Sequence, residues 1–346
     1  MSNYTILPIQ TIGEGLKTRE VGKRVFGSGA SLMLPKKPKW GFYAHEGEDY
    51  VGGVFIDQVS PREGMLSWIF VDSKAQGHKL GVRLLEAGIK AMDEKGLKTQ
   101  FSLVRADNTA SWNMFAKNGY KRPGVFRSLF GYSPKSFLKR LGYSFATGYS
   151  TWVKDEALKK ADVHPKRRAI LKSLMFSLFV GAALSLFSLR GTEFLFIGMA
   201  MVAGITALRM VVAYPIARMH GPVRFDAPQG GTSLSVILAL AFSAWWPAFG
   251  FFVPKEDIWR DREFARYEGM QAFATWMSLL FVYAGMSRLY PGIFNSGLET
   301  ILDLIIIYQV IPFFPFDGMD GAKVANYSKV LYVIGVALSL TAIIFF

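Results

Sequence analysis

The chain has 346 residues, of which 51% are apolar, 15% are aromatic and only 19% are charged. This composition excludes a disordered protein and is more apolar than that of an ordinary soluble enzyme. The absence of cysteine excludes disulfides, thiolate metal ligands and a cysteine nucleophile. No two of the four histidines lie within one helical turn, so no histidine-pair metal site is expected.

The positive charge is concentrated in the first half of the chain. Residues 1–168 carry a net charge of +13 and residues 169–346 one of +1, which together give the total of +14. A basic half joined to an apolar half favours the anionic face of a membrane, or an anionic cofactor, as the partner. Nucleic acid is not expected, because the basic residues are spread out. Residues 1–10 contain no long apolar run, so we expect no secretory signal.

The first half alternates short strand-like and helix-like segments. Strands are predicted where apolar residues alternate or where β-branched and aromatic residues gather. Helices are predicted where apolar residues recur every three or four positions. In chain order these elements are the strands 40–45, 50–56 and 65–71, the helix 80–95, the strand 101–104 and the helix 110–118, which ends at Gly119.

The junction at residues 71–81 has a pattern that suits a phosphate group. A strand runs through a loop containing Gly77 directly into a helix. Free N–H groups and the dipole at a helix start favour an anion, and glycine lets the backbone approach it closely. Lys74 and Lys79 add positive charge. An ordinary tight turn is the alternative interpretation.

Two motifs together resemble the GNAT acetyltransferase family. The motif Gln/Arg-x-x-Gly-x-Gly/Ala matches QGHKLG at residues 76–81. The motif Asn-x-x-Ser/Ala, followed by an aromatic residue and then Gly-Phe/Tyr, matches Asn108, Ser111, Phe115, Gly119 and Tyr120. The resemblance covers about residues 1–155. It implies an α+β fold, a mixed sheet with helices that is splayed open where acetyl-CoA lies.

The resemblance also implies a set of cofactor-binding residues. The backbone amides of residues 76–81 would hold the pyrophosphate, and strand residues 69–71 would hold the pantetheine arm. Two residues of the second motif would face that arm. The implied cofactor-binding residues are Ile69, Val71, Gln76, Gly77, His78, Lys79, Leu80, Gly81, Asn108 and Ser111.

The catalytic groups are less well defined, because the sequence departs from the family pattern. Phe115 stands where the family often has the tyrosine that protonates the leaving thiolate, and Lys79 replaces a glycine. Tyr120 is the remaining candidate acid, although the family aromatic there is usually a core residue. Candidates for the base are Glu63 and Asp72, which flank the strand, and His45; a plain surface position is the alternative for each.

The second half predicts a polytopic α-helical membrane domain with five or six transmembrane helices. Seven Lys and Arg residues at 154–172 precede its first apolar run, which places the first half in the cytoplasm of a multi-pass cell-membrane protein. We therefore expect a cytoplasmic domain at 1–155, a basic linker at 156–168 and a membrane domain at 169–346. The apolar runs are 169–189, 194–216, 234–253, 270–286, 301–316 and 330–346, each near the length that spans a bilayer.

The third run has two interpretations. If residues 234–253 cross the bilayer, Lys255 and five further basic residues lie outside. If the run turns back at the Trp-Trp-Pro sequence 245–247, they stay inside, as the positive-inside rule favours. We expect the re-entrant form; six plain spans are the alternative.

The segment from Gln309 to Gly318 resembles the Asn-x-x-Pro-x-x-x-Leu-Asp-Gly motif of the site-2 protease family of intramembrane zinc proteases. The family's HExxH motif is missing: its positions fall on Arg209, Met210 and Ala213. A catalytic zinc needs three protein ligands and an activated water, so Asp317 alone predicts neither a metal nor an active metalloprotease. The alternative is that a Pro/Gly break in a span mimics the motif.

Arg209 would then lie within an apolar helix, where a lone charge is costly and normally has a partner. We expect an Arg209–Asp317 ion pair in place of the metal, with Asp303 as the other candidate partner.

The sequence thus predicts a membrane-anchored N-acetyltransferase that transfers acetyl from acetyl-CoA to an amine acceptor, a protein or a small molecule, near the membrane. The alternatives are a non-catalytic acyl-CoA sensor and a pseudoprotease scaffold that binds a membrane-protein partner.

Overall fold

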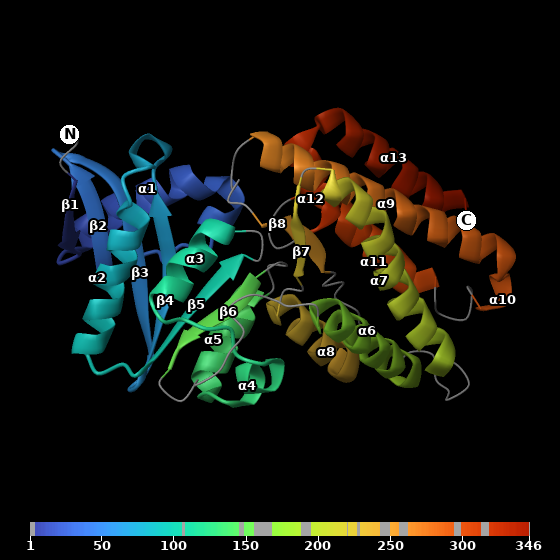
Figure 1. Cartoon of the computed structure of the whole chain (residues 1–346), viewed down its shortest axis with the longest axis horizontal. Helices are drawn as coiled ribbons and strands as arrows, with labels where there is room; N and C mark the ends of the chain where they lie inside the picture. The colour runs from blue at the N-terminus through green and yellow to red at the C-terminus, as the bar shows by residue number, and fades with distance from the viewer. Residues whose placement is uncertain are drawn as a thin grey trace. The chain divides into compact units, whose positions relative to one another are not determined.

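The computed structural model describes residues 4–105, 108–144, 149–155, 168–187, 195–219, 221–226, 229–242, 250–255, 262–293, 299–312 and 318–345. The chain forms two compact units (Figure 1). The N-terminal unit contains Met1–Val104, Ser111–Arg140 and Thr151–Val163. The C-terminal unit contains Arg105–Ala110, Leu141–Ser150 and His164–Phe346.

A six-stranded mixed sheet, ordered β1-β2-β3-β4-β5-β6, organises the N-terminal unit (Figure 1). Strands β1 to β4 pair antiparallel in succession, whereas β4 and β5 are parallel. This confirms the predicted GNAT-like mixed sheet with helices. The strands are β1 (Thr5–Pro8), β2 (Gly41–Glu46), β3 (Asp49–Ser60), β4 (Glu63–Val71), β5 (Thr99–Arg105) and β6 (Tyr149–Lys154).

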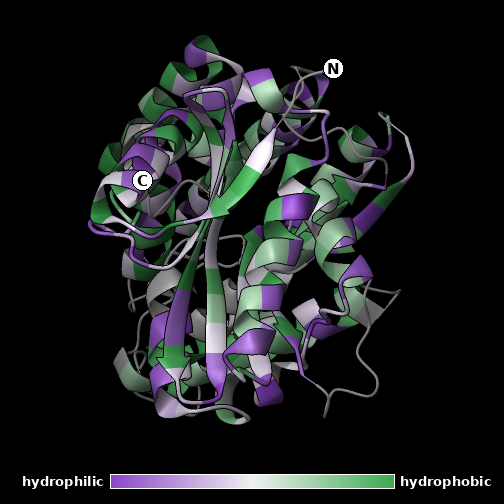
Figure 2. Cartoon of the chain, turned by 90° about the vertical axis from the view of Figure 1, so that its left-hand side faces the viewer, coloured by the Kyte–Doolittle hydropathy of each residue, from purple (hydrophilic) through white to green (hydrophobic). Residues whose placement is uncertain are grey.

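Helices cover both faces of this sheet. On one face Val21 of α1 packs with Phe55 and Phe70 of β3 and β4. On the other face α2 lies so close that a Cβ atom at Gly88 would be 2.8 Å from Leu66 Cδ2. Figure 2 shows hydrophilic and hydrophobic segments mixed along these elements, as expected for helices with one buried face. The helices are α1 (Ile12–Ser31), the 3₁₀ turn η1 (Ser73–Ala75), α2 (Leu80–Glu94), α3 (Thr109–Lys117), α4 (Val125–Phe130) and α5 (Pro134–Ser144).

Strand β1 and helix α1 were not predicted from the sequence. Residues 12–31 contain five glycines, which weaken a helical pattern by roughly 1 kcal/mol each relative to alanine. The packing explains two of them. A Cβ atom at Gly15 would lie 2.2 Å from the Pro38 carbonyl oxygen, and one at Gly22 would lie 3.1 Å from Leu34 Cδ1. These glycines allow α1 to pack closely against the segment that follows it.

The C-terminal unit consists mainly of helices. Trp276 of α9 is fully buried at its centre, and its indole N–H donates to Ser339 Oγ of α13 at 3.0 Å. A two-stranded antiparallel sheet pairs β7 (Val223–Asp226) with β8 (Phe251–Pro254). The helices are α6 (Arg168–Phe187), α7 (Leu195–Arg218), α8 (Gln229–Phe242), α9 (Arg262–Leu289), α10 (Pro291–Ile293), α11 (Glu299–Val310), α12 (Asp320–Tyr327) and α13 (Lys329–Phe345).

Two of these helices are long and apolar enough to cross a bilayer: Ala169–Leu186 within α6, and α7. Helix α13 is also apolar but shorter. Length and composition alone give this result, and it applies to the described residues. The five or six spans expected from the sequence therefore stay a prediction.

The apolar run at 234–253 is not one continuous helix. Helix α8 ends at Phe242, and residues 251–254 form strand β8. Because β7 directly precedes α8 and pairs with β8, the two ends of the intervening segment lie side by side. A single straight span over these residues is thus wrong, and the expected turn itself, at 245–247, lies outside the described residues.

The contact between α11 and α12 provides a stability test. A Cβ atom at Gly321 would lie 1.7 Å from the Gln309 carbonyl oxygen, whereas one at Gly204 would contact nothing within 4 Å. We expect Gly321→Ala to lower the free energy of unfolding by about 1–3 kcal/mol through overpacking. Gly204→Ala should be neutral or raise it by up to about 1 kcal/mol. Thermal unfolding of both full-length variants tests this, and equal stabilities would show that the helices do not approach this closely.

Candidate functional site

Strands β4 and β5 separate halfway along their length. Their parallel pairing runs from Glu63 with Thr99 to Leu66 with Ser102. Beyond that point residues 68–71 of β4 pair with β3 on one side, and within the described chain the pairing with β5 does not continue on the other. Among the described residues, the backbone N–H and C=O groups of residues 69–71 along this edge are therefore available to an extended ligand that contains amides. Ile69 and Val71, both half-buried, lie on this part of β4.

The phosphate-binding pattern lies directly after this strand edge. Asp72 caps η1 by accepting from the Lys74 backbone N–H at 3.2 Å, and α2 begins at Leu80. Among the described residues, none accepts a hydrogen bond from the backbone amides of residues 77–82. Such a row of free amides at the start of a 15-residue helix can bind an oxyanion.

The loop retains a glycine-like backbone at both of its special positions. Gly77 has a φ of 87°, and a Cβ atom there would contact nothing within 4 Å. Lys79 has a φ of 56° and is the single non-glycine residue with positive φ in the described chain. Lysine thus adopts the left-handed conformation at the position where the family motif has glycine. The departure from the motif changes the side chain but not the shape of the loop.

The other predicted cofactor residues lie around the start of α2 or on α3. His78 contacts Tyr4, with ring centroids 5.1 Å apart, and Leu80 is buried. A Cβ atom at Gly81 would lie 3.9 Å from Met114 Sδ of α3, so the helix that contains Ser111 lies beside the start of α2. Gln76 ends η1. Asn108 precedes α3, and its backbone N–H donates to the Arg105 carbonyl.

Tyr120 is a core residue. Its side chain is fully buried, and its hydroxyl donates to Gln100 Oε1 at 3.0 Å. Burial raises the pKa of the Tyr120 hydroxyl well above its usual range. Phe115 is also buried and packs against it, with ring centroids 5.0 Å apart. In this arrangement neither residue presents a proton donor to the separated strands.

The three predicted bases have local structural partners. Glu63, nearly buried at the paired end of β4, accepts from the Ser133 backbone N–H at 3.0 Å and from the Ser133 hydroxyl, just before α5. The hydrogen bond from the Lys74 amide, together with Arg24, lowers the pKa of Asp72, which makes it a weaker base. His45 Nδ1 lies 2.7 Å from the Gly47 carbonyl in the β2–β3 turn. The structure does not bring these three groups together.

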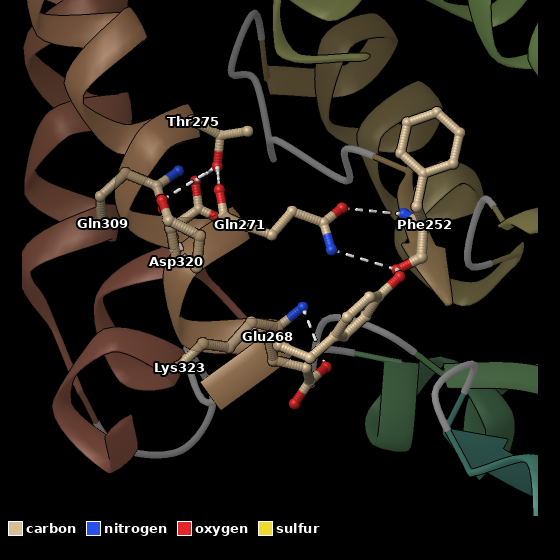
Figure 3. Close-up of polar contacts among 9 residues, drawn as sticks. Phe252, Glu268, Gln271, Thr275, Gln309, Asp320 and Lys323 are labelled. Carbon is tan, nitrogen blue, oxygen red and sulfur yellow. Dashed lines mark hydrogen bonds and ion pairs between the residues drawn. The ribbon is translucent and has the colours of Figure 1, made fainter. Parts of the chain in front are cut away.

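A second group of polar residues is buried in the C-terminal unit (Figure 3). The side-chain amide of Gln271 on α9 forms two hydrogen bonds with the backbone of Phe252 on β8. Its oxygen accepts from the Phe252 N–H, and its nitrogen donates to the Phe252 carbonyl. The Thr275 hydroxyl donates to Asp320 Oδ2 at 3.0 Å, and the Asp320 backbone N–H donates to Gln309 Oε1 at 2.9 Å. Sequence analysis missed Gln271, Thr275 and Asp320, although Glu268, Gln271 and Thr275 recur at helical spacing in an otherwise apolar segment.

Arg209 has an ionic partner, Asp320, that was not among those predicted, and the predicted pair with Asp317 stays a prediction. Its Nη1 lies 2.6 Å from Asp320 Oδ2, and the two side chains are only 8% and 9% exposed. Asp303 instead accepts from the Tyr283 hydroxyl, and Asp317 lies outside the described residues. A second buried pair joins Lys323 to Glu268 at 3.6 Å (Figure 3). Within the described residues, no group of three metal-ligating side chains is found.

The left-handed backbone at Lys79 gives one testable prediction. Lys79→Gly should raise the free energy of local unfolding at the start of α2 by about 0.5–1 kcal/mol, because glycine adopts this conformation without the steric cost. The reverse change at the other end of α2, Gly96→Ala at φ 71°, should lower stability by a similar amount. Hydrogen exchange of the α2 amides in the full-length protein measures both. A destabilised Lys79→Gly variant would contradict the prediction.

The Arg209–Asp320 pair gives a second prediction. Asp320→Ala leaves the Arg209 guanidinium buried without this carboxylate, so we expect the free energy of unfolding to fall by about 3–5 kcal/mol. Glu94→Ala breaks the exposed pair with Lys90 and should cost less than about 0.5 kcal/mol. Thermal or chemical unfolding of both variants tests this. Similar losses in the two would show that the buried pair contributes little.

Residues 30–120 match the model of the Acetyltransferase (GNAT) family. Among solved structures, the ribosomal-protein-S18-alanine N-acetyltransferase from Escherichia coli is 18% identical, with a TM-score of 0.34 over 46% of this chain and 99% of that one. A GNAT family acetyltransferase from Elizabethkingia anophelis with acetyl-CoA bound is 14% identical, with a TM-score of 0.34 over 45% and 99%. No curated protein matches the chain. The family match shows a GNAT acetyltransferase domain at residues 30–120, which supports acyl transfer as the general class of chemistry.

Proposed function

We propose that this protein is a membrane-anchored N-acetyltransferase that transfers acetyl from acetyl-CoA to an amine acceptor near the membrane. One observation carries the proposal: the edge of β4 at residues 69–71, where the pairing with β5 has ended in the described chain, leads directly into a loop with free amides at the start of α2. An edge that binds amides followed by a site that binds phosphate matches the chemistry of coenzyme A. The family match over the same residues supports it.

In this proposal the backbone does most of the binding. The amides of residues 77–82 hold the pyrophosphate, with Lys74 and Lys79 adding positive charge. Residues 69–71 of β4 bind the two amide groups of the pantetheine arm in the manner of an added strand. Asn108 and Ser111, at the start of α3, face this arm. Acetyl-CoA supplies an activated acyl group as co-substrate, and the chain supplies binding and orientation.

The N-terminal unit is cytoplasmic in this proposal, and residues 169–346 anchor it in the cell membrane. Helices α6 and α7 support an anchor by their length and apolarity. The side chains of Phe196 and Val211 on α7 are 77% and 69% exposed, as expected for a surface that faces lipid. The basic segment before α6 supports the orientation. We further propose that this half resembles a site-2 protease without its metal, in which the Arg209–Asp320 pair occupies the region of the missing ligands.

A second candidate function is a non-catalytic acyl-CoA sensor. The burial of Tyr120 and Phe115 favours it, because neither residue presents a proton donor beside β4. A sensor binds acetyl-CoA without releasing CoA, whereas an enzyme releases CoA when an amine is present. A pseudoprotease scaffold with a membrane-protein partner needs neither acetyl-CoA binding nor CoA release.

The cofactor site is tested by measuring acetyl-CoA binding to the full-length protein by calorimetry. Gly77→Glu places a carboxylate where the pyrophosphate would lie and should weaken binding by at least tenfold. Gly96→Glu is the matched control, because Gly96 also has positive φ and open space around it but lies at the other end of α2. The Gly96→Glu variant should bind like the parent protein, since both variants carry the same strain and charge.

Either of two results would reject the cofactor site. One is the absence of acetyl-CoA binding to the parent protein, and the other is equal binding by both variants. CoA release can be measured directly with a thiol reagent, because the chain contains no cysteine to react with it.

A further inference from the structure

A polar cluster lies where β4 separates from β5. In the pairing of β3 with β4, Phe55 is opposite Trp68 and Ile56 is opposite Leu66, so Ser67 has no residue opposite it. Ser67 is therefore a β-bulge, and it directly follows the last residue that pairs with β5. Bulges redirect side chains and are common beside active sites. The Ser67 hydroxyl donates to Asp57 Oδ2 on β3.

Lys139 of α5 completes this cluster. Its Nζ lies 2.8 Å from Asp57 Oδ2, and the two side chains are 32% and 33% exposed. Both contacts use the same carboxylate oxygen, and among the described residues no group donates to Oδ1. A half-exposed primary amine beside a carboxylate with a free oxygen is thus held at the closed end of the separated strands.

If the proposed function holds, the pantetheine arm of acetyl-CoA leads to this cluster. The pantetheine arm would start at the phosphate loop, beyond Val71, and run back along β4 toward Ser67. These four steps along the strand cover about 13 Å. The arm cannot continue past Leu66, where β5 closes the edge. The thioester at its end would then lie at the bulge.

We propose that Lys139 is acetylated by the acetyl-CoA bound to its own chain, and this inference rests on the proposed function. Lys139 Nζ gives one proton to Asp57, and the neutral amine attacks the thioester carbonyl carbon. A C–N bond forms and the C–S bond breaks, while the second nitrogen proton goes to the leaving thiolate to give CoA–SH. Acetylation removes the charge of Lys139, so its ion pair with Asp57 is lost. Once Asp57 has released the accepted proton to solvent, its carboxylate is available to an external amine.

A comparison lysine exists in the same unit. Lys154 Nζ lies 3.1 Å from Asp93 Oδ2, and its side chain is 34% exposed. Its exposure and ionic partner match those of Lys139, but Asp93 lies on α2 rather than at the bulge. Uncatalysed acetylation by acetyl-CoA should therefore affect both lysines about equally, whereas the proposed reaction affects Lys139 alone.

The test incubates the full-length protein with acetyl-CoA and follows the acetylation of each lysine by peptide mass spectrometry. We expect Lys139 to react at least tenfold faster than Lys154, at a rate that saturates with acetyl-CoA and does not depend on protein concentration. Gly77→Glu should reduce Lys139 to the rate of Lys154, and Gly96→Glu should not. Asp57→Asn should reduce Lys139 acetylation at least tenfold at unchanged acetyl-CoA affinity, and Asp57→Glu should restore part of it.

Equal rates for Lys139 and Lys154 in a protein that binds acetyl-CoA would overturn this inference while leaving the cofactor site intact. A rate that rises with protein concentration would also overturn it, because the reaction would then occur between chains. Failure of the parent protein to bind acetyl-CoA would instead reject the proposed function. If Asp57→Asn lost both acetylation and acetyl-CoA binding, the role given to Asp57 would be wrong.

Discussion

The parting of β4 from β5 after Leu66 and Ser102 is the constraint on which the candidate site depends. A paired strand satisfies its own backbone groups and leaves nothing for a ligand. Within the described chain, residues 63–66 of β4 pair with β5, and this pairing ends at Leu66 while the strand continues to Val71. The Ser102 hydroxyl donates to the Leu66 carbonyl at the point of separation, so this carbonyl has a hydrogen-bond partner where the two strands part.

The backbone, rather than the side chains, defines the phosphate loop. Lys79 shows this, because it adopts the left-handed conformation that glycine favours while keeping a basic side chain. The conformation costs free energy, and its position at the start of α2 orients the first free amides of the helix. Lys79 departs from the family motif in residue type, because the motif has glycine there. It does not depart in backbone conformation. Compared with glycine, lysine at this position has a steric cost but adds a positive charge near the expected anion.

The sequence predicted the strands on either side of the site well because their patterns are local. Residues 65–71 form a short apolar run interrupted by Ser67, typical of a strand covered on both faces, and Leu80, Leu84 and Leu85 recur at helical spacing on one buried face. Helix α1 was missed because its glycines serve contacts with Pro38 and Leu34, and no local pattern encodes these. For the same reason Asp57, Ser67 and Lys139 were not predicted as a group. They come from three elements, and a bulge and an ion pair bring them together.

The buried charges of the C-terminal unit show the same limit and a further physical point. A lone buried charge is costly, and the buried Arg209 guanidinium accordingly has a carboxylate partner. The choice of Asp317 relied on a motif and stays a prediction, whereas the structure shows a pair of Arg209 with Asp320, three residues further on. Asp320 is also bound by Thr275 and, through its backbone, by Gln309, so α7, α9, α11 and α12 share one carboxylate-centred network. A buried polar network of this kind favours one arrangement of the helices, because other arrangements leave more of its members without partners. In an apolar unit, where helices could otherwise slide past one another, this preference fixes which residues of the four helices face each other.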